Sequence, residues 1–328
     1  MIELQGNSLK ISFPEVHAKA HCRIEFQRTL RIPDDNNEYP LPPGFGPFPL
    51  DHVDNLGEKL PQSWRTHGGI YLPMYQSEAM WIKFFGDYPF AIKIAAGKIN
   101  AVTGNAWKNP LDDKPQDYIV SSEQAWLDGY NVGKGRVRQF VAMPLGEGYS
   151  AEEQLTGQSE HGGLQIIAYP MKASYYHANF ERYRVESECY LETPMFCRKA
   201  SVEDMALAPG GLMRQEIHED EYGIDAWDHS LSARCFVHIT NSETYRQLTG
   251  RQAPGKPFKA KDYTQAGLPW FEYYRDGKAL GGSEKLAGLV SVAAKWLQKT
   301  QKTYPDNTPV KPAVVKKLGD AKVREGDF

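Results

Sequence analysis

The densest group of ionisable side chains lies between residues 218 and 229, where two histidines and five carboxylates stand within twelve residues. Divalent metals bind imidazole nitrogens and carboxylate oxygens that converge within roughly 2.0–2.6 Å of the ion. The spacing matches neither an EF-hand loop nor the H-E-x-x-H pattern. We therefore expect a solvated surface loop and no cofactor, with a divalent metal site as the alternative. The candidate ligands of that site are His218, Asp220, Asp225, Asp228 and His229.

A second group surrounds residues 157–162 (GQSEHG), which match the G-x-S-x-G nucleophile elbow at their first three positions. His161 stands where that motif has its second glycine, and the strand-turn-helix context of the motif is missing. Nearby carboxylates could still act with this histidine as acid and base. We expect turn structure here, and the alternative is a catalytic site built from Glu147, Glu153 and His161.

Two aromatic clusters are candidates for binding, because flat rings stack on sugars and prolines. One lies in Tyr39–Leu50, where five prolines and two glycines exclude a helix or a central strand. The other is Gly267–Tyr274, whose rings cannot all point inward from one strand. The candidate binding residues are Phe45, Phe48, Trp270, Phe271, Tyr273 and Tyr274.

Alternation of apolar and polar residues is the main pattern of the elements that must position these side chains. Cys22, Ile24 and Phe26 alternate with polar neighbours, as in a half-buried antiparallel strand. Glycines between such runs predict hairpins at Ala96-Gly97 and at residues 133–135. The sequence thus predicts a mainly β (β-rich α+β) fold with an antiparallel β-sandwich or a barrel-like core. The other predicted strands are Leu9–Phe13, Met80–Phe85, Phe90–Ala95, Lys98–Val102, Arg136–Met143, Gly163–Tyr169, Tyr183–Tyr190, Leu212–Ile217 and Ala233–Ile239.

Helical periodicity is confined mainly to the end of the chain. Ser283 can cap one late amphipathic helix in which apolar residues from Leu286 to Leu297 form a single stripe. Shorter helices are expected after Asn241 and from Ala151. We expect residues 1–300 to form one large β-rich unit, or two packed β subdomains dividing near 170–200. Residues 301–328 are expected to be an extended, loosely packed C-terminal tail.

The composition excludes several classes of protein. Among 328 residues, 38 Lys and Arg stand against 41 Asp and Glu, so the net charge of −3 argues against a dedicated nucleic-acid binder but leaves room for a local basic patch. No apolar run approaches the ~20 residues that span a bilayer, and the first ten residues do not resemble a signal peptide. The four cysteines lack C-x-x-C spacing and are expected to be reduced and buried. A cytoplasmic location is therefore expected.

Three segments also carry a resemblance: residues 39–50 (YPLPPGFGPFPL), 139–165 (QFVAMPLGEGYSAEEQLTGQSEHGGLQ) and 267–274 (GLPWFEYY). They resemble a widespread set of uncharacterised soluble bacterial proteins without an established activity. The resemblance extends over most of the chain and implies a free-standing protein, but it implies no catalytic residues.

Three functional hypotheses follow. The first is a non-catalytic binding protein that uses exposed aromatics and the Pro-rich loop to contact a protein or glycan. The second is a metal-dependent or acid/base hydrolase whose site uses one of the two ionisable groups. The third is a structural subunit of a larger assembly, with homo-oligomers as one form.

Overall fold

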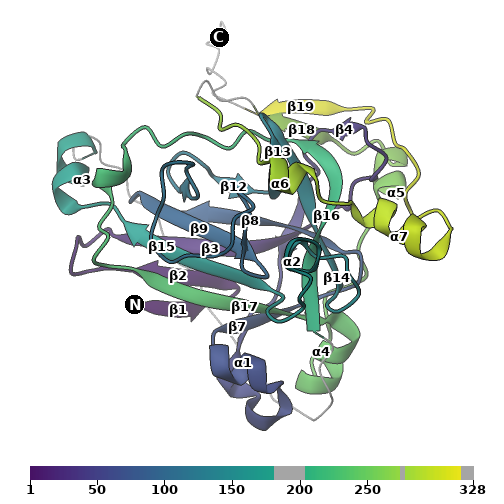
Figure 1. The fold of residues 1–328 in the computed structure, drawn as a ribbon, viewed down its shortest axis with the longest axis horizontal. Coiled ribbons are helices and arrows are strands. Elements are labelled where there is room, and N and C mark those ends of the chain that lie inside the picture. Colours follow the sequence, from purple (N-terminus) through teal and green to yellow (C-terminus); the bar gives the residue numbers. More distant parts are fainter. Residues whose placement is uncertain (181–203, 274–277, 319–328) are drawn as a thin grey trace, which may run out of the picture.

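The computed structural model describes residues 1–180, 204–273 and 278–318. These residues form one large, mostly antiparallel sheet with short helices at its margins (Figure 1), which confirms the predicted β-rich class. The first strands are β1 (Ile2–Gln5), β2 (Ser8–Ser12), β3 (His21–Thr29), β4 (Glu38–Tyr39), β5 (Gly44–Pro47), β6 (Asp51–His52), β7 (Ile70–Met74), β8 (Ala79–Phe85), β9 (Phe90–Ala96) and β10 (Ile99–Asn100). The others are β11 (Ile119–Val120), β12 (Trp126–Leu127), β13 (Gly129–Gly133), β14 (Arg136–Pro144), β15 (Leu164–Pro170), β16 (Asp204–Arg214), β17 (Ala233–Asn241), β18 (Trp270–Tyr273) and β19 (Val315–Leu318).

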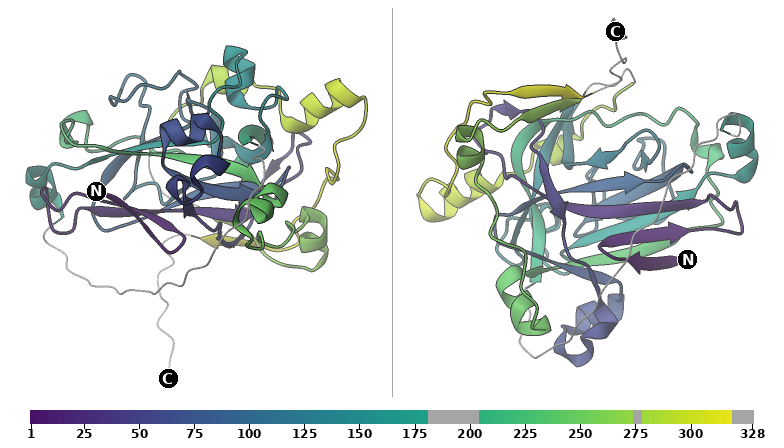
Figure 2. Two further views of the ribbon diagram at one scale, coloured as in Figure 1. Left: turned by 90° about the horizontal axis from the view of Figure 1, so that it is seen from below. Right: turned by 180° about the vertical axis from the view of Figure 1, so that it is seen from behind.

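The helices are short and lie outside the sheet (Figures 1 and 2). No helix among the described residues has the length and apolar character needed to cross a membrane. The α-helices are α1 (Gln62–His67), α2 (Ala151–Thr156), α3 (Ala173–Asn179), α4 (Ser242–Thr249), α5 (Ala260–Gln265), α6 (Glu284–Ala287) and α7 (Val292–Thr300).

The main ladder of the sheet runs in the order β1, β2, β3, β8, β14, β16, β17, β15, β9. The sheet folds back on itself, since the ring of Phe13 after β2 lies 6.1 Å from the ring of Phe90 in β9. Among the described strands no ladder joins the β1 end to the β9 end, so the sheet stays open. The barrel-like alternative is therefore wrong for this part of the chain.

The main core lies inside the folded-back sheet and includes buried residues from Leu9 to Leu289. In the first part of β3 the predicted alternation holds, with Cys22, Ile24 and Phe26 fully buried, but Gln27 and Thr29 further along are buried as well. Strand β9 is buried at all seven positions because both of its faces are covered. One of these positions is Lys93, whose ammonium group pairs with the carboxylate of Asp117 at 2.6 Å. Ladders between β14 and β16 and between β15 and β17 connect residues on either side of 170–200.

The predicted late helix is two helices. Ser283 caps α6, and its side chain accepts a hydrogen bond from the backbone N–H of Leu286. The chain leaves the helix after Ala287, and Ser291 caps α7. Leu286 is buried in the main core, whereas Leu297 is 52% exposed, so the predicted single apolar stripe is wrong at its end. The helices predicted after Asn241 and from Ala151 are confirmed as α4 and α2.

Both predicted hairpins are present, and so is part of the predicted irregular structure. Gly97 joins β9 to β10 with a φ of 57°, a value that favours glycine. The Pro-rich segment is mostly loop, but β5 pairs with β3 at two positions. The start of the predicted tail packs through buried Tyr304, and β19 extends it beside β18. The strand predicted at residues 183–190 lies outside the described residues.

Candidate binding groove

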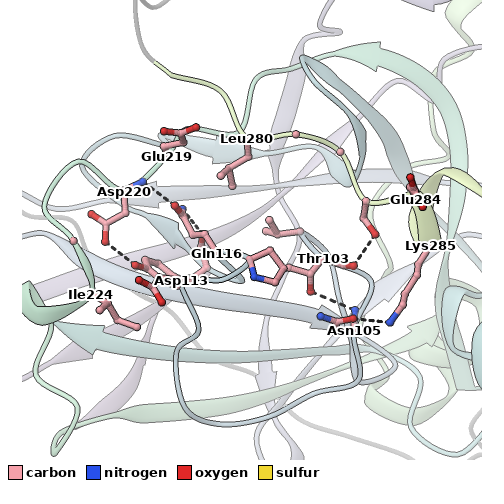
Figure 3. A pocket seen from close by; sticks show the side chains of 17 residues that line it. Thr103, Asn105, Asp113, Gln116, Glu219, Asp220, Ile224, Leu280, Glu284 and Lys285 are labelled. Carbon is pink, nitrogen blue, oxygen red and sulfur yellow. Dashed lines mark hydrogen bonds between the residues drawn. The ribbon is translucent and has the colours of Figure 1, made fainter.

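Three segments far apart in the sequence surround a groove of about 870 Å³. They are the loops between Val102 and Tyr118, the start of the acidic segment at residues 219–224, and residues 280–285 at the start of α6. Figure 3 shows Asp113, Glu219 and Asp220 at one end of this groove, and Glu284, Lys285 and Asn105 at the other. We call it the acidic groove.

The carboxylate of Asp220 forms part of the floor and accepts three hydrogen bonds. Its Oδ2 atom accepts from the Tyr118 hydroxyl at 2.6 Å and from the Trp227 indole N–H at 2.8 Å. Its Oδ1 atom accepts from the backbone N–H of Tyr222 at 2.9 Å. Burial, together with the bond to Asp220, raises the pKa of Tyr118. Asp220 therefore holds the floor together and has little capacity left for a metal or a proton transfer.

Gln116 fixes the acidic segment against the loop that precedes β11. Its side-chain NH₂ group donates to the carbonyl oxygens of Tyr118 at 2.9 Å and His218 at 3.2 Å. Its carbonyl oxygen accepts from the backbone N–H of Asp220 at 2.8 Å (Figure 3). The bonds to His218 and Asp220 connect residues about one hundred positions apart. They give the floor a defined shape before any ligand is present.

The opposite wall is held by β13 and by the loop after β10. Asn131 in β13 donates to the carbonyl of Gly281 and accepts from the backbone N–H of Ser283. The hydroxyl of Ser283 donates to the carbonyl of Thr103 at 2.6 Å. Gly282 lies so close to β13 that a Cβ atom would stand 2.0 Å from the backbone nitrogen of Gly133. The wall is therefore a close backbone approach that requires glycine.

The groove carries more negative than positive charge. Asp113, Glu219 and Glu284 are exposed at its margin, and among the described residues of its lining the one cation is Lys285. The ammonium group of Lys285 donates to the side chain of Asn105 at 2.7 Å. Among the described residues, neither Glu219 nor Glu284 forms an ion pair, and Asp113 lies 3.6 Å from the highly exposed Lys114. The end of the groove with Asp113 and Glu219 thus presents carboxylates to solvent.

The structure separates the predicted metal ligands. Only Asp220 lines the groove, while His218 is buried beside it. Asp228 accepts two hydrogen bonds from Ser230, and the ring of His229 bonds the carbonyl of Ile224. Asp225 is exposed. Within residues 1–180, 204–273 and 278–318 no group of three His, Cys, Asp or Glu side chains could hold a metal ion.

The predicted acid/base residues also have separate partners. Glu153 forms a capping box with Ser150 at the start of α2, and Glu147 pairs with Lys299 at 2.5 Å. No hydrogen bond or ion pair among the described residues joins either carboxylate to His161. Burial lowers the pKa of His161, and its Nδ1 atom is buried without a hydrogen-bond partner among the described residues.

The neighbour that organises the His161 loop is Glu152. Its carboxylate accepts hydrogen bonds from the backbone N–H groups of residues 160, 161 and 162, each at 2.9 Å. The ring of His67 lies 6.0 Å from that of His161, and His238 stacks on Trp64 at 4.4 Å. Burial lowers the pKa of His238 to about 3, so this imidazole is neutral near pH 7. These stacked rings are packed structure at the margin of the sheet.

The predicted aromatic binding residues divide into buried and accessible ones. Phe48 and Trp270 are fully buried, so neither ring can contact a partner in this conformation. Phe45 is half-buried beside Phe258 at 4.9 Å. Phe271 is half-buried in β18, and Tyr273 is 40% exposed with its ring against Trp126. Tyr274 lies outside the described residues.

No protein-family model, curated protein or solved structure matches this chain. The resemblance based on residues 39–50, 139–165 and 267–274 therefore stays a prediction.

Sequence reasoning missed most of the groove. No motif spacing marks most residues of the groove, because they come from loops that meet only in the folded protein. These residues are Asp113, Gln116, Glu284 and Lys285. The one sequence signal for the groove was the acidic segment that contributes Glu219 and Asp220. The cap at Ser283 predicted where the helix starts, but it did not predict that this helix start forms a wall of the acidic groove.

Proposed function

We propose that the protein is a non-catalytic binding protein whose acidic groove receives a positively charged, extended segment of a partner protein. The observation that supports this most is the pair of exposed carboxylates, Asp113 and Glu219, above a floor that is already hydrogen-bonded. A preformed floor lowers the cost of ordering the site on binding. Exposed carboxylates select a lysine or arginine side chain by charge.

The size of the groove suits such a ligand. A volume of about 870 Å³ lies within the usual range for ligand sites, roughly 300–1,000 Å³. Lys285 at the far end is held by Asn105, so a bound cation at the Asp113 end would not face a free ammonium group. A segment with its basic residues at one end therefore fits the distribution of charge.

The test is fluorescence anisotropy with a labelled peptide of alternating lysine and glycine, compared with the same peptide carrying glutamate for lysine. We expect saturable binding of the lysine peptide alone. The double variant Asp113→Asn, Glu219→Gln should weaken this binding about tenfold, since each neutralised carboxylate removes a charge-assisted contact. The matched control is the double variant Glu15→Gln, Glu58→Gln, which removes the same charge at exposed positions outside the groove.

Equal weakening by the control pair would show attraction to net charge and would contradict a site in the groove. Equal binding of both peptides would contradict a basic ligand. Far-ultraviolet circular dichroism and urea unfolding of each variant would verify that the groove is still folded.

We also propose a cytoplasmic location. Both described cysteines, Cys22 and Cys235, are free and buried, and burial raises the thiol pKa of each to about 12. Such thiols are unreactive and need no oxidising compartment.

A further inference from the structure

A second concave surface lies away from the acidic groove and has the opposite charge. It is a hollow of about 250 Å³ between the turn after β7, the segment before α5 and the chain after α7. Its lining includes Arg31, Ser77, Lys256, Phe258, Lys259 and Asp306. It shares no residue with the groove. We call it the cationic hollow.

Three cations and one carboxylate line this hollow, which leaves two positive charges. Lys259 pairs with Asp306 at 2.9 Å, while Lys256 is exposed and forms no ion pair with another described residue. Two uncompensated positive charges match the charge of a phosphate monoester near neutral pH, about −1.5 to −2.

Arg31 is the fixed member of the set. Its guanidinium lies 4.4 Å from the centre of the Tyr304 ring, and its Nη2 atom donates to the carbonyl of Pro305 at 2.6 Å. Its Nη1 atom is buried and has no hydrogen-bond partner among the described residues. Buried donors of this kind are normally satisfied by water or an anion. The guanidinium therefore supplies a preorganised positive charge at the base of the hollow.

The margin of the hollow carries an aromatic ring. Phe258 is 63% exposed and stands next to Lys259, with its ring 4.9 Å from that of Phe45. A ring supported from behind by another ring offers a surface on which a flat ligand can stack. A neighbouring hollow of about 310 Å³ shares Lys259 and Asp306 and leaves room for further atoms of a ligand.

We propose that the cationic hollow binds a phosphate monoester carried on a flat ring, as a small-molecule ligand. The phosphate contacts the ammonium group of Lys256 and is attracted by the positive charges of Arg31 and Lys259. The ring stacks on Phe258. This site is independent of the groove and of the function proposed for it.

The experiment is isothermal titration of the full chain with three probes: phenyl phosphate, glycerol phosphate and benzyl alcohol. We expect one saturable site for phenyl phosphate, about threefold to tenfold weaker binding of glycerol phosphate, and no binding of benzyl alcohol. Lys256→Gln should weaken both phosphates about tenfold, because one charge-assisted contact is lost. Phe258→Ala should weaken phenyl phosphate alone.

The control variant is Lys302→Gln, an exposed lysine that does not line the hollow. It should leave all three titrations unchanged. The proposal fails if phenyl phosphate shows no saturation up to about 10 mM, a limit that corresponds to about −2.7 kcal/mol. It also fails if Lys302→Gln weakens binding as much as Lys256→Gln, which would indicate an adventitious charge effect. Equal affinity of Phe258→Ala and the unaltered protein for phenyl phosphate would overturn the ring part of the ligand.

Discussion

The acidic groove and the cationic hollow differ in how their charged groups are held. In the groove, Asp220 accepts from the Tyr118 hydroxyl, and Gln116 bonds the backbone of His218 and Asp220, so these bonds span about one hundred residues of chain. In the hollow, Lys256 and Phe258 belong to one exposed segment and only Arg31 is fixed. A change in the floor or wall of the groove should therefore affect the stability of the protein. A change in Lys256 or Phe258 should affect ligand binding alone.

The largest expected effect concerns Asp128, which precedes β13, the strand that holds the wall of the groove. Burial raises the pKa of Asp128 to about 7, while its unfolded value is about 3.9. The folded state then binds more protons than the unfolded state between these values, so stability falls as the pH rises from about 4 to about 7. The loss amounts to up to about 4 kcal/mol. Asp128→Asn should lack this loss. The free energy of unfolding of the variant, relative to that of the unaltered protein, should therefore be higher at pH 8 than at pH 5.

Urea unfolding at the two pH values measures that difference. Asparagine can still accept the hydrogen bond from the Trp126 indole, which lies 2.7 Å from the carboxylate of Asp128. The idea that Asp128 is protonated in the folded protein at pH 5 would be contradicted if variant and unaltered protein differed in free energy of unfolding by the same amount at both pH values.

The second effect concerns two adjacent glycines in the wall. A Cβ atom at Gly282 would stand 2.0 Å from the backbone nitrogen and 2.1 Å from the Cα atom of Gly133, whereas one at Gly281 would meet nothing within 4 Å. Gly282→Ala should therefore lower the free energy of unfolding by about 3 kcal/mol, the upper range for overpacking. Gly281→Ala is the matched control and should change it by less than about 0.5 kcal/mol. Equal losses, measured by urea unfolding, would show that the wall is not a close backbone approach.

A smaller effect is expected at the floor. Tyr118→Phe removes the hydroxyl that donates to Asp220 at 2.6 Å, and the indole of Trp227 remains as a donor. The loss of one buried hydrogen bond should cost about 1–2 kcal/mol. Thermal or urea unfolding checks this, and Tyr273→Phe, at an exposed tyrosine outside the groove, serves as comparison. If Tyr118→Phe leaves the free energy of unfolding unchanged, Asp220 does not hold the floor together.

The smallest effect sharpens the separation of the two sites. Combining Asp113→Asn and Glu219→Gln with Lys256→Gln should give effects on peptide and phenyl phosphate binding that add within about 0.5 kcal/mol, because the sites share no residue. Titration of each ligand into the single-site and combined variants measures the coupling. A larger coupling would show that the groove and the hollow act as one site.

Local patterns predicted many of the elements. The alternation in β3, the glycine between β9 and β10, and the caps of α2 and α4 each depend on neighbours a few residues away. Contacts between distant parts of the chain overrode the local pattern elsewhere. The strand expected at Leu212–Ile217 is β16 (Asp204–Arg214), because residues 205–209 also pair with β14. The single late helix is interrupted because Leu286 joins the main core and Val292 joins another cluster.

The β-rich class, the hairpins and the helix starts follow from the period of apolar residues and from local backbone preferences, so they can be read from the sequence. Which charged residues share a surface depends on the folded arrangement of the strands. In the folded protein, Asp113 and Glu219 lie in one groove and Trp270 is buried. Glu147 forms an ion pair with Lys299, and Glu153 belongs to the capping box of α2. The physical reason is that a side chain's partners depend on where long-range strand pairing places its loop, and spacing along the chain does not encode that position.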